Sequence, residues 1–206
     1  MAKYSTHPVV NALTDEFHPC QILADFQTIA EHRGGVDNLK NQTIAYLATR
    51  PTTCRTPICS AARGGMNVRV AGPNGYLPDP QIVADAEAIA SETGGSVLVT
   101  TDPKEAVAGA TACSPTHGFP WAKNRNTPSV PSVLGLSGER RTHVLCQGRR
   151  HLPALPAGIP CKEVTSEVID GPQSVVWDEA GNRLHAQKAL LTWLAGKARG
   201  DESLLA

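Results

Sequence analysis

The chain has 206 residues, a formal net charge of zero, 41% hydrophobic residues and only 4% aromatic residues. This length suits one domain or two small ones, and the neutral charge argues against a nucleic-acid-binding protein. No apolar run approaches the roughly 18 residues of a membrane span, and the first residues lack the apolar core of a secretory signal. We therefore expect a cytoplasmic protein without a membrane or nucleic-acid partner.

The six cysteines form no Cys-x-x-Cys pair and no Cys/His spacing typical of a metal site. Cysteines of cytoplasmic proteins usually stay reduced. The sequence therefore predicts neither disulfide bonds nor a bound metal, and no motif in it indicates a cofactor.

The most informative stretch begins at Tyr4 and ends in His18-Pro19-Cys20-Gln21. Proline suits the first position of a helix, where its missing N–H costs nothing. The apolar residues that follow have helical spacing, and Gly34-Gly35 predicts the end of the helix. These apolar residues are Ile22, Leu23, Phe26, Ile29 and Ala30.

This arrangement places His18 and Gln21 at the N-terminal end of a helix. Free N–H groups and the positive end of the helix dipole favour an anion there. An imidazole and a primary amide at such an end can hold a phosphate or polarise a carbonyl group. The alternative is an ordinary capped helix start with no ligand.

The middle of the chain alternates between predicted strands and helices. Short apolar strands are expected at 43–47, 67–71 and 96–100, with a helix at 80–93 and a short helix from Pro103 to about Ala108. Near the C-terminus, 174–177 resembles a strand and 184–195 a helix. This alternation predicts an α/β fold with a parallel sheet flanked by helices.

Two segments do not fit that pattern. Residues 48–63 show no periodicity and contain two prolines and three arginines, and residues 111–162 are rich in proline. A structureless loop of about fifty residues is unusual inside a compact domain. We therefore expect both segments to be aberrant.

The stretch containing N-A-L-T-D and His-Pro-x-Gln resembles the carbamoyl-phosphate helix of ornithine carbamoyltransferases. The stretch from Glu163 to Leu191 resembles the end of the same family, with Arg183 in N-R-L-H-A-Q-K-A. The resemblance implies that His18, Pro19, Cys20, Gln21 and Arg183 bind carbamoyl phosphate and that His18 polarises the carbamoyl group. Without the resemblance, the favoured interpretation of Arg183 is a solvated arginine at the start of a helix or a partner of Asp178 or Glu179.

The resemblance also implies an organisation of the chain. Residues 1–33 match the end of the carbamoyl-phosphate domain and the linking helix, 34–195 match the ornithine-binding domain, and 196–206 form a tail. On this basis the sequence starts inside the first domain of the family. Members of the family are commonly homotrimers built through that first domain.

The two aberrant segments have a common explanation in a shifted reading frame. Degenerate codons for 116–124 permit D-T-W-I-S-M-G-Q-E when read one base earlier, and the same shift on 48–62 permits G-D-A-A-N-N-M. Codons for 150–158, read one base later, permit I-F-L-H-C-L-P-A. These strings resemble the family's ornithine loop, strand-to-helix loop and catalytic-cysteine motif. We predict compensating frame slips, either in the gene or in its sequence.

In the frame as it stands, several family motifs are absent. The chain contains no S-T-R-T phosphate loop and no His-Cys-Leu-Pro motif, and the residues expected to hold ornithine are missing. Cys146 and Cys161 do not lie in an equivalent context, although His143 and His151 flank Cys146.

The family acts without a cofactor on carbamoyl phosphate and L-ornithine, giving L-citrulline for arginine biosynthesis. We expect this polypeptide by itself to be inactive. The alternatives are a non-catalytic remnant of such an enzyme, a weak anion-binding α/β module, or an aspartate-specific member of the family.

Overall fold

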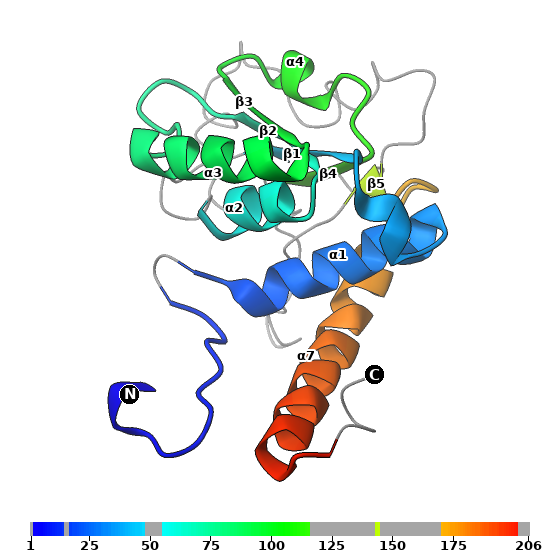
Figure 1. Cartoon of the computed structure of the whole chain (residues 1–206). Helices are drawn as coiled ribbons and strands as arrows, with labels where there is room; N and C mark the ends of the chain where they lie inside the picture. The colour runs from blue at the N-terminus through cyan, green and yellow to red at the C-terminus, as the bar shows by residue number, and fades with distance from the viewer. Residues whose placement is uncertain (1, 15–16, 48–54, 116–142, 145–169, 202–206) are drawn as a thin grey trace, which may run out of the picture.

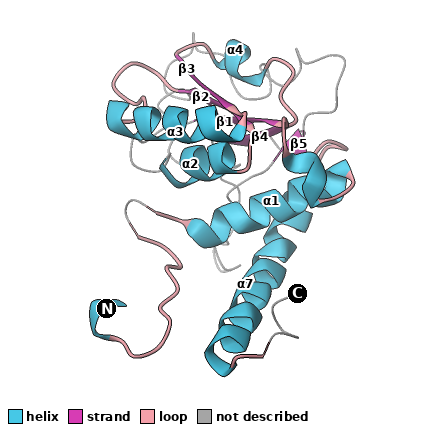
Figure 2. Cartoon of the chain, in the orientation of Figure 1, coloured by secondary structure: helices cyan, strands magenta, loops and turns pink. Residues whose placement is uncertain are grey.

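The computed structural model describes residues 2–14, 17–47, 55–115, 143–144 and 170–201. Its centre is a parallel sheet with the strand order β3-β2-β1-β4-β5. The strands are β1 (Thr43–Leu47), β2 (Asn67–Ala71), β3 (Ser96–Thr100), β4 (Ala112–Pro115) and β5 (His143–Val144). The predicted α/β class, with a parallel sheet flanked by helices, is confirmed (Figure 2).

The helices are α1 (Pro19–Arg33), α2 (Arg55–Arg63), α3 (Pro80–Thr93), α4 (Pro103–Val107) and α7 (Val176–Arg199). Two 3-10 turns, η1 (Ala2–Tyr4) and η2 (Val36–Leu39), complete the described elements. Figure 1 shows α2 and α3 on one side of the sheet and α4 on the other, while α7 crosses α1 beside the sheet. The segment before α1 runs away from the body of the molecule.

Alternate residues of β1 face two different layers. Ile44 and Tyr46 pack in a core with side chains of α1, α2 and α3, whereas Ala45 and Leu47 pack with Ala106 and other small residues on the α4 side. This alternation follows from the two-residue period of a strand. Because both faces of β1 are buried, its sequence is apolar without interruption, as is typical of parallel sheets.

The sequence-predicted boundaries of the central elements are confirmed. Helix α3 begins after Asp79, whose side chain accepts a hydrogen bond from the N–H of Gln81 at 2.8 Å. It ends at Gly94, a left-handed cap with a φ of +87°. Helix α1 likewise ends at Gly34, where φ is +84°. Left-handed conformations favour glycine because it has no Cβ.

The sequence shows no periodicity in residues 55–63 and predicts no helix there, but the structure contains one. These residues form α2, with Ile58, Ala61 and Ala62 buried along one face. Pro57 obscured the helix in the sequence, but proline is tolerated within a first turn. Residues 48–54 lie outside the described part of the chain.

The segment 111–162 also contains regular structure, because Ala112–Pro115 forms β4 beside β1 and His143–Val144 forms β5. The remaining positions of this segment, with Cys146, His151 and Cys161, lie outside the described residues. The strand expected at 174–177 is wrong, since Val176 already begins α7, which continues to Arg199.

Some apolar side chains of the helices are exposed. Leu23 is 41% exposed, so it does not belong to the buried face of α1, and Leu184 and Leu191 of α7 are exposed as well.

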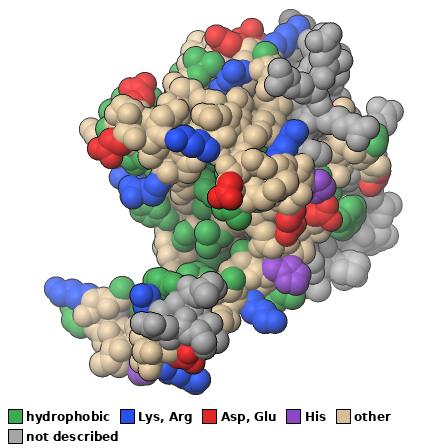
Figure 3. Space-filling view, turned by 45° about the vertical axis from the view of Figure 1, so that its right-hand side comes forward, with side chains coloured by type: hydrophobic (Ala, Val, Ile, Leu, Met, Phe, Trp, Pro, Cys, Tyr) green, Lys and Arg blue, Asp and Glu red, His purple; other side chains and the backbone are tan. Residues whose placement is uncertain are grey.

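Figure 3 shows acidic and basic side chains interspersed on one face of the molecule. Among the helices described, none has the length and hydropathy needed to cross a membrane.

Candidate functional site

Helix α1 begins directly after His18, which takes the N-cap position without a side-chain capping bond. The backbone N–H of His18 donates to Thr56 Oγ1 of α2 at 2.9 Å. The start of α1 is therefore attached to a helix from the segment that the sequence suggested was aberrant. Sequence reasoning missed Thr56 because no local pattern connects it with His18.

The imidazole of His18 is half-buried, and its Nδ1 atom is buried without a hydrogen-bond partner in the described part of the chain. Burial lowers the pKa of His18, and the positive charge of Arg183 lowers it further, although a hydrogen bond with the Ala12 backbone acts in the opposite direction. A lowered pKa favours the neutral imidazole near pH 7. A neutral ring can use this nitrogen as a donor or as an acceptor.

Gln21 lies in the first turn of α1. The sequence predicts an open position at the end of the helix, but in the structure Gln21 is buried. It is 5% exposed, and its amide is engaged on both sides. The Nε2 atom donates to Asp25 Oδ1 at 2.9 Å and to Glu179 Oε1, and the Oε1 atom accepts from Arg183 Nη1 at 2.5 Å.

Arg183 reaches this place from the second half of the sequence. It lies in the third turn of α7, and its Nε atom is buried with no partner among the described residues. The structure brings Arg183 together with His18 and Gln21, since Arg183 bonds to Gln21 and acts electrostatically on His18. Asp178 instead pairs with His32 at 2.9 Å.

The other two residues of the motif, Pro19 and Cys20, contribute to the structure of the helix start. Pro19 occupies the first turn of α1, where a proline is compatible with the helix. Cys20 is 1% exposed, and its thiol donates to the backbone oxygen of Asn11 at 3.6 Å. Unlike His18, neither residue has a buried side-chain nitrogen or oxygen without a partner among the described residues.

Two buried carboxylates, Asp25 and Glu179, complete the cluster. Sequence reasoning missed Asp25 and named Glu179 only as a possible partner of Arg183. Burial raises the pKa of Asp25 to about 7; the hydrogen bond from Gln21 opposes this shift and the charge of Glu179 adds to it. Burial also raises the pKa of Glu179, against the effects of Gln21 and Arg183. Their spacing was a usable signal, because residues four apart share a helix face: Gln21 with Asp25, and Glu179 with Arg183.

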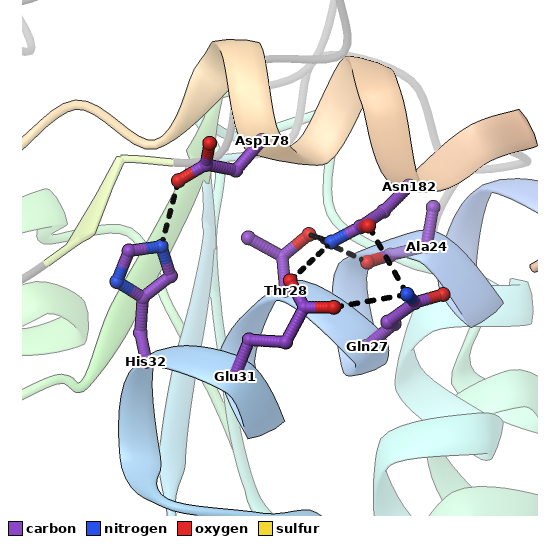
Figure 4. A network of polar contacts seen from close by, with 7 residues as sticks. All are labelled: Ala24, Gln27, Thr28, Glu31, His32, Asp178 and Asn182. Atoms are coloured by element: carbon purple, nitrogen blue, oxygen red, sulfur yellow. Dashed lines mark hydrogen bonds and ion pairs between the residues drawn. The ribbon is translucent and has the colours of Figure 1, made fainter. Parts of the chain in front are cut away.

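A second set of polar contacts continues along the same two helices (Figure 4). The side chain of Asn182 donates to Thr28 Oγ1 at 3.0 Å and to Glu31 Oε2 at 2.7 Å, and it accepts from Gln27 at 3.1 Å. We call the whole interface the α1–α7 polar seam. It consists of Gln21, Asp25, Gln27, Thr28, Glu31 and His32 of α1 and Asp178, Glu179, Asn182 and Arg183 of α7.

The order of the strands marks a second place suited to a ligand. The chain adds β2 and β3 on one side of β1 and β4 and β5 on the other, so the order changes direction between β1 and β4. Open α/β sheets bind ligands outside the carboxyl ends of the strands at such a point. Here these ends are Leu47 and Pro115, which are paired in register.

Metal chemistry has no evident place in the described ranges. Within them, no three His, Cys, Asp or Glu side chains are grouped so that they could hold a metal ion. The chemistry available at the start of α1 is that of a neutral imidazole, an amide and a guanidinium. In general, such groups can bind and polarise a small oxyanion or carbonyl compound.

Comparison with protein-family models identifies two matching domains. Residues 40–126 and 138–194 match the aspartate/ornithine carbamoyltransferase Asp/Orn binding domain. Residues 1–31 match the carbamoyl-P binding domain of the same family.

Curated relatives carry the same name. Ornithine carbamoyltransferase of Bifidobacterium longum subsp. infantis is 62% identical over 213 aligned positions, covering 100% of this chain and 65% of the relative. Ornithine carbamoyltransferase of Clavibacter michiganensis is 48% identical, covering 94% of this chain and 63% of the relative. The chain thus spans slightly less than two thirds of the length of these relatives.

Solved structures agree with these matches. Ornithine carbamoyltransferase from Gloeobacter violaceus has a TM-score of 0.80 at 37% identity, covering 94% of this chain and 64% of the solved one. The enzyme from Pyrococcus furiosus has a TM-score of 0.75 at 34% identity, with coverages of 93% and 60%. On the family-model match over most of its length, the chain belongs to the aspartate/ornithine carbamoyltransferase family.

Proposed function

We propose that this chain provides the acceptor-binding domain and part of the carbamoyl-phosphate site of an ornithine carbamoyltransferase. The reaction is carbamoyl transfer from carbamoyl phosphate to L-ornithine, which gives L-citrulline and phosphate. The observation that carries this proposal is the bond from Arg183 Nη1 to Gln21 Oε1 at 2.5 Å. It joins two motifs that are 162 residues apart in the sequence.

The proposed chemistry requires positioning and charge neutralisation. The δ-amino nitrogen of ornithine attacks the carbamoyl carbon, the bond from that carbon to the phosphate oxygen breaks, and the amine loses a proton. Arg183 is suited to the phosphate because a guanidinium stays charged. His18, kept neutral by burial and by Arg183, is suited to the carbamoyl oxygen.

The acceptor is proposed to bind at the carboxyl ends of β1 and β4. Residues 48 and 116, which immediately follow these strands, begin the segments whose shifted reading frame permits G-D-A-A-N-N-M and D-T-W-I-S-M-G-Q-E. Residues 48–54 and 116–124 lie outside the described residues. Ornithine is the proposed acceptor because the strings that follow β1 and β4 resemble the family's ornithine loops. The names of the curated relatives support the same acceptor.

A titration of the 206-residue polypeptide with carbamoyl phosphate tests the binding part of the proposal. We expect NMR shifts of the backbone amides of residues 20–22 at millimolar ligand. Arg183→Ala should abolish these shifts, whereas Lys188→Ala, an exposed position on the same helix, should leave them unchanged. A folded wild-type sample without any shift would reject the site.

An assay of citrulline formation tests the catalytic part. The polypeptide contains neither S-T-R-T nor His-Cys-Leu-Pro, so we expect no measurable turnover from it alone. The effects of removing residues that act together in one site are not additive, and the loss of several of them removes most of the catalytic rate. Turnover near the usual 1–10³ s⁻¹ scale of enzymes would show that this expectation is wrong.

The shifted frame is tested by the coding DNA across codons 48–63 and 111–162. Codons compatible with the permitted strings would support the prediction, and a Pro115 codon ending in A would exclude it for the second segment.

The action without a cofactor, the cytoplasmic location and the homotrimeric assembly implied by the resemblance remain proposals. A sedimentation measurement checks the assembly.

A further inference from the structure

The orientation of the Gln21 amide is determined by its three partners. Its nitrogen faces two carboxylate oxygens, of Asp25 and Glu179, and its oxygen faces the guanidinium of Arg183. A flipped amide would place its oxygen against the two carboxyl groups and its nitrogen against a cation that can only donate. The contact with Arg183 and the contact with any ionised carboxylate would then be repulsive, so one orientation is selected.

The oriented amide in turn holds Arg183. Gln21 Oε1 accepts from Nη1, while Arg183 Nε remains buried and unpartnered within the described residues. The guanidinium lies close enough to His18 to lower the pKa of its imidazole. A chain of contacts therefore runs from the carboxylates through Gln21 to Arg183 and His18.

The carboxylates themselves are well placed for such a role. Asp25 is 1% exposed and Glu179 is 3% exposed, and they come from different helices but meet at one nitrogen. Two carboxylates beside each other do not ionise independently, and their raised pKa values indicate a proton retained by the pair near neutral pH. Retaining that proton lets both oxygens stay against Gln21 with less mutual repulsion.

We propose that Asp25 and Glu179 are positioning residues that hold the Gln21 amide so that its oxygen keeps Arg183 beside His18. This inference rests on the proposed function, because the oriented group is the carbamoyl-phosphate site. Neither carboxylate touches the ligand in this proposal. They act through Gln21, and their removal should leave His18 in place.

The first experiment examines the ligand-free protein. We expect the Gln21 side-chain N–H protons to be protected from exchange in wild type and to exchange at least about tenfold faster in Glu179→Ala, which removes a charged acceptor. The Arg183 Nε–H resonance should shift in the same variant. Glu179→Gln retains an acceptor oxygen and should restore most of the protection.

Asp178→Ala is the matched control. It removes a neighbouring carboxylate of α7 that also bonds to α1, but its partner is His32 and not Gln21. It should leave the Gln21 and Arg183 signals unchanged. If Glu179→Ala, folded by circular dichroism, also leaves both signals unchanged, the positioning role is rejected.

The second experiment measures ligand binding in the same variants. Carbamoyl phosphate should bind about tenfold more weakly to Glu179→Ala than to wild type and Asp178→Ala. Unchanged binding after loss of the Gln21 protection would overturn the proposal. If wild type itself binds no carbamoyl phosphate, the proposed function loses its site, while a Gln21 response to Glu179→Ala would still support the orienting contacts.

A wild-type measurement keeps the proposal testable if Glu179→Ala does not fold. The groups facing the carboxylate pair are Gln21 on α1 and Arg183 on α7. The Gln21 side-chain resonances should follow a titration centred near pH 7, above the range of His18, whose pKa is lowered. Absence of any Gln21 titration between pH 5 and pH 9 would contradict the proton-sharing pair.

Discussion

The sheet core and the inner part of the α1–α7 polar seam, around Gln21, are two buried regions of opposite chemistry. The core around Ile44 and Tyr46 is apolar and non-directional, whereas the seam is a chain of directed hydrogen bonds between carboxylates, amides and a guanidinium. Burial of apolar groups stabilises in proportion to area, but a buried polar group stabilises only when its partner is present. The core therefore determines that the chain folds, and the seam determines how His18, Gln21 and Arg183 are placed.

The largest effect is expected from the core. Ile44→Ala should reduce the free energy of unfolding by about 2–5 kcal/mol, because it removes a side chain that is 0% exposed in the central strand. Val97→Ala, on the edge strand β3 and only partly buried, should cost clearly less. Denaturant unfolding followed by circular dichroism measures both, and an equal cost at the two positions would show that the sheet centre is not the dominant core.

The seam should make stability depend on pH. The folded pKa of Asp25, about 7, exceeds the unfolded value, so the folded state binds more protons between about pH 4 and pH 7. This contribution is fully present below pH 4 and is lost as pH rises through 7, up to a few kcal/mol. Glu179 shifts stability in the same direction, and His18 in the opposite one because its folded pKa is lowered.

Asp25→Asn isolates the Asp25 part of that dependence. The difference in unfolding free energy between wild type and variant should move in favour of the variant as pH rises from 4 to 8. Unfolding curves at four or five pH values provide the measurement. A difference that stays constant over this range would mean that Asp25 ionises normally in the folded protein.

A smaller effect is expected at Asn182, which is an uncharged member of the seam. Asn182→Ala removes an acceptor for Gln27 and a donor to Thr28 and Glu31, and should cost about 1–3 kcal/mol. Lys188→Ala, exposed on the same helix, should be near neutral. If both variants unfold at the same denaturant concentration as wild type, the Asn182 contacts contribute nothing to the seam.

The smallest effect is expected at the outer end of the seam. Asp178→Ala breaks the pair with His32, whose side chains are 57% and 32% exposed, and should cost less than about 1 kcal/mol. The cost should shrink further in 1 M salt, because exposed charges are screened. A large cost that is independent of salt would place this pair functionally with the buried seam and not at its rim.

Local sequence predicted much of the sheet side of the molecule. The strands at 43–47, 67–71 and 96–100 and helix α3 have the predicted boundaries, since Asp79, Pro80 and Gly94 give chemical start and stop signals. Helix α2 and the beginning of α7 were missed, because Pro57 and the β-branched pair Val175-Val176 carry local preferences that packing overrides.

Local signals were enough to predict the α/β class, the start of α1 at His18-Pro19 and the candidate residues of the site. The burial of Gln21 between Asp25, Glu179 and Arg183, and the contact of Thr56 with the His18 backbone, appear only in the folded chain. The difference lies in the sequence separation of the interacting residues. Caps, periodicity and motifs act within a few residues, whereas these partners come from α1, α2 and α7 and meet only when the helices pack.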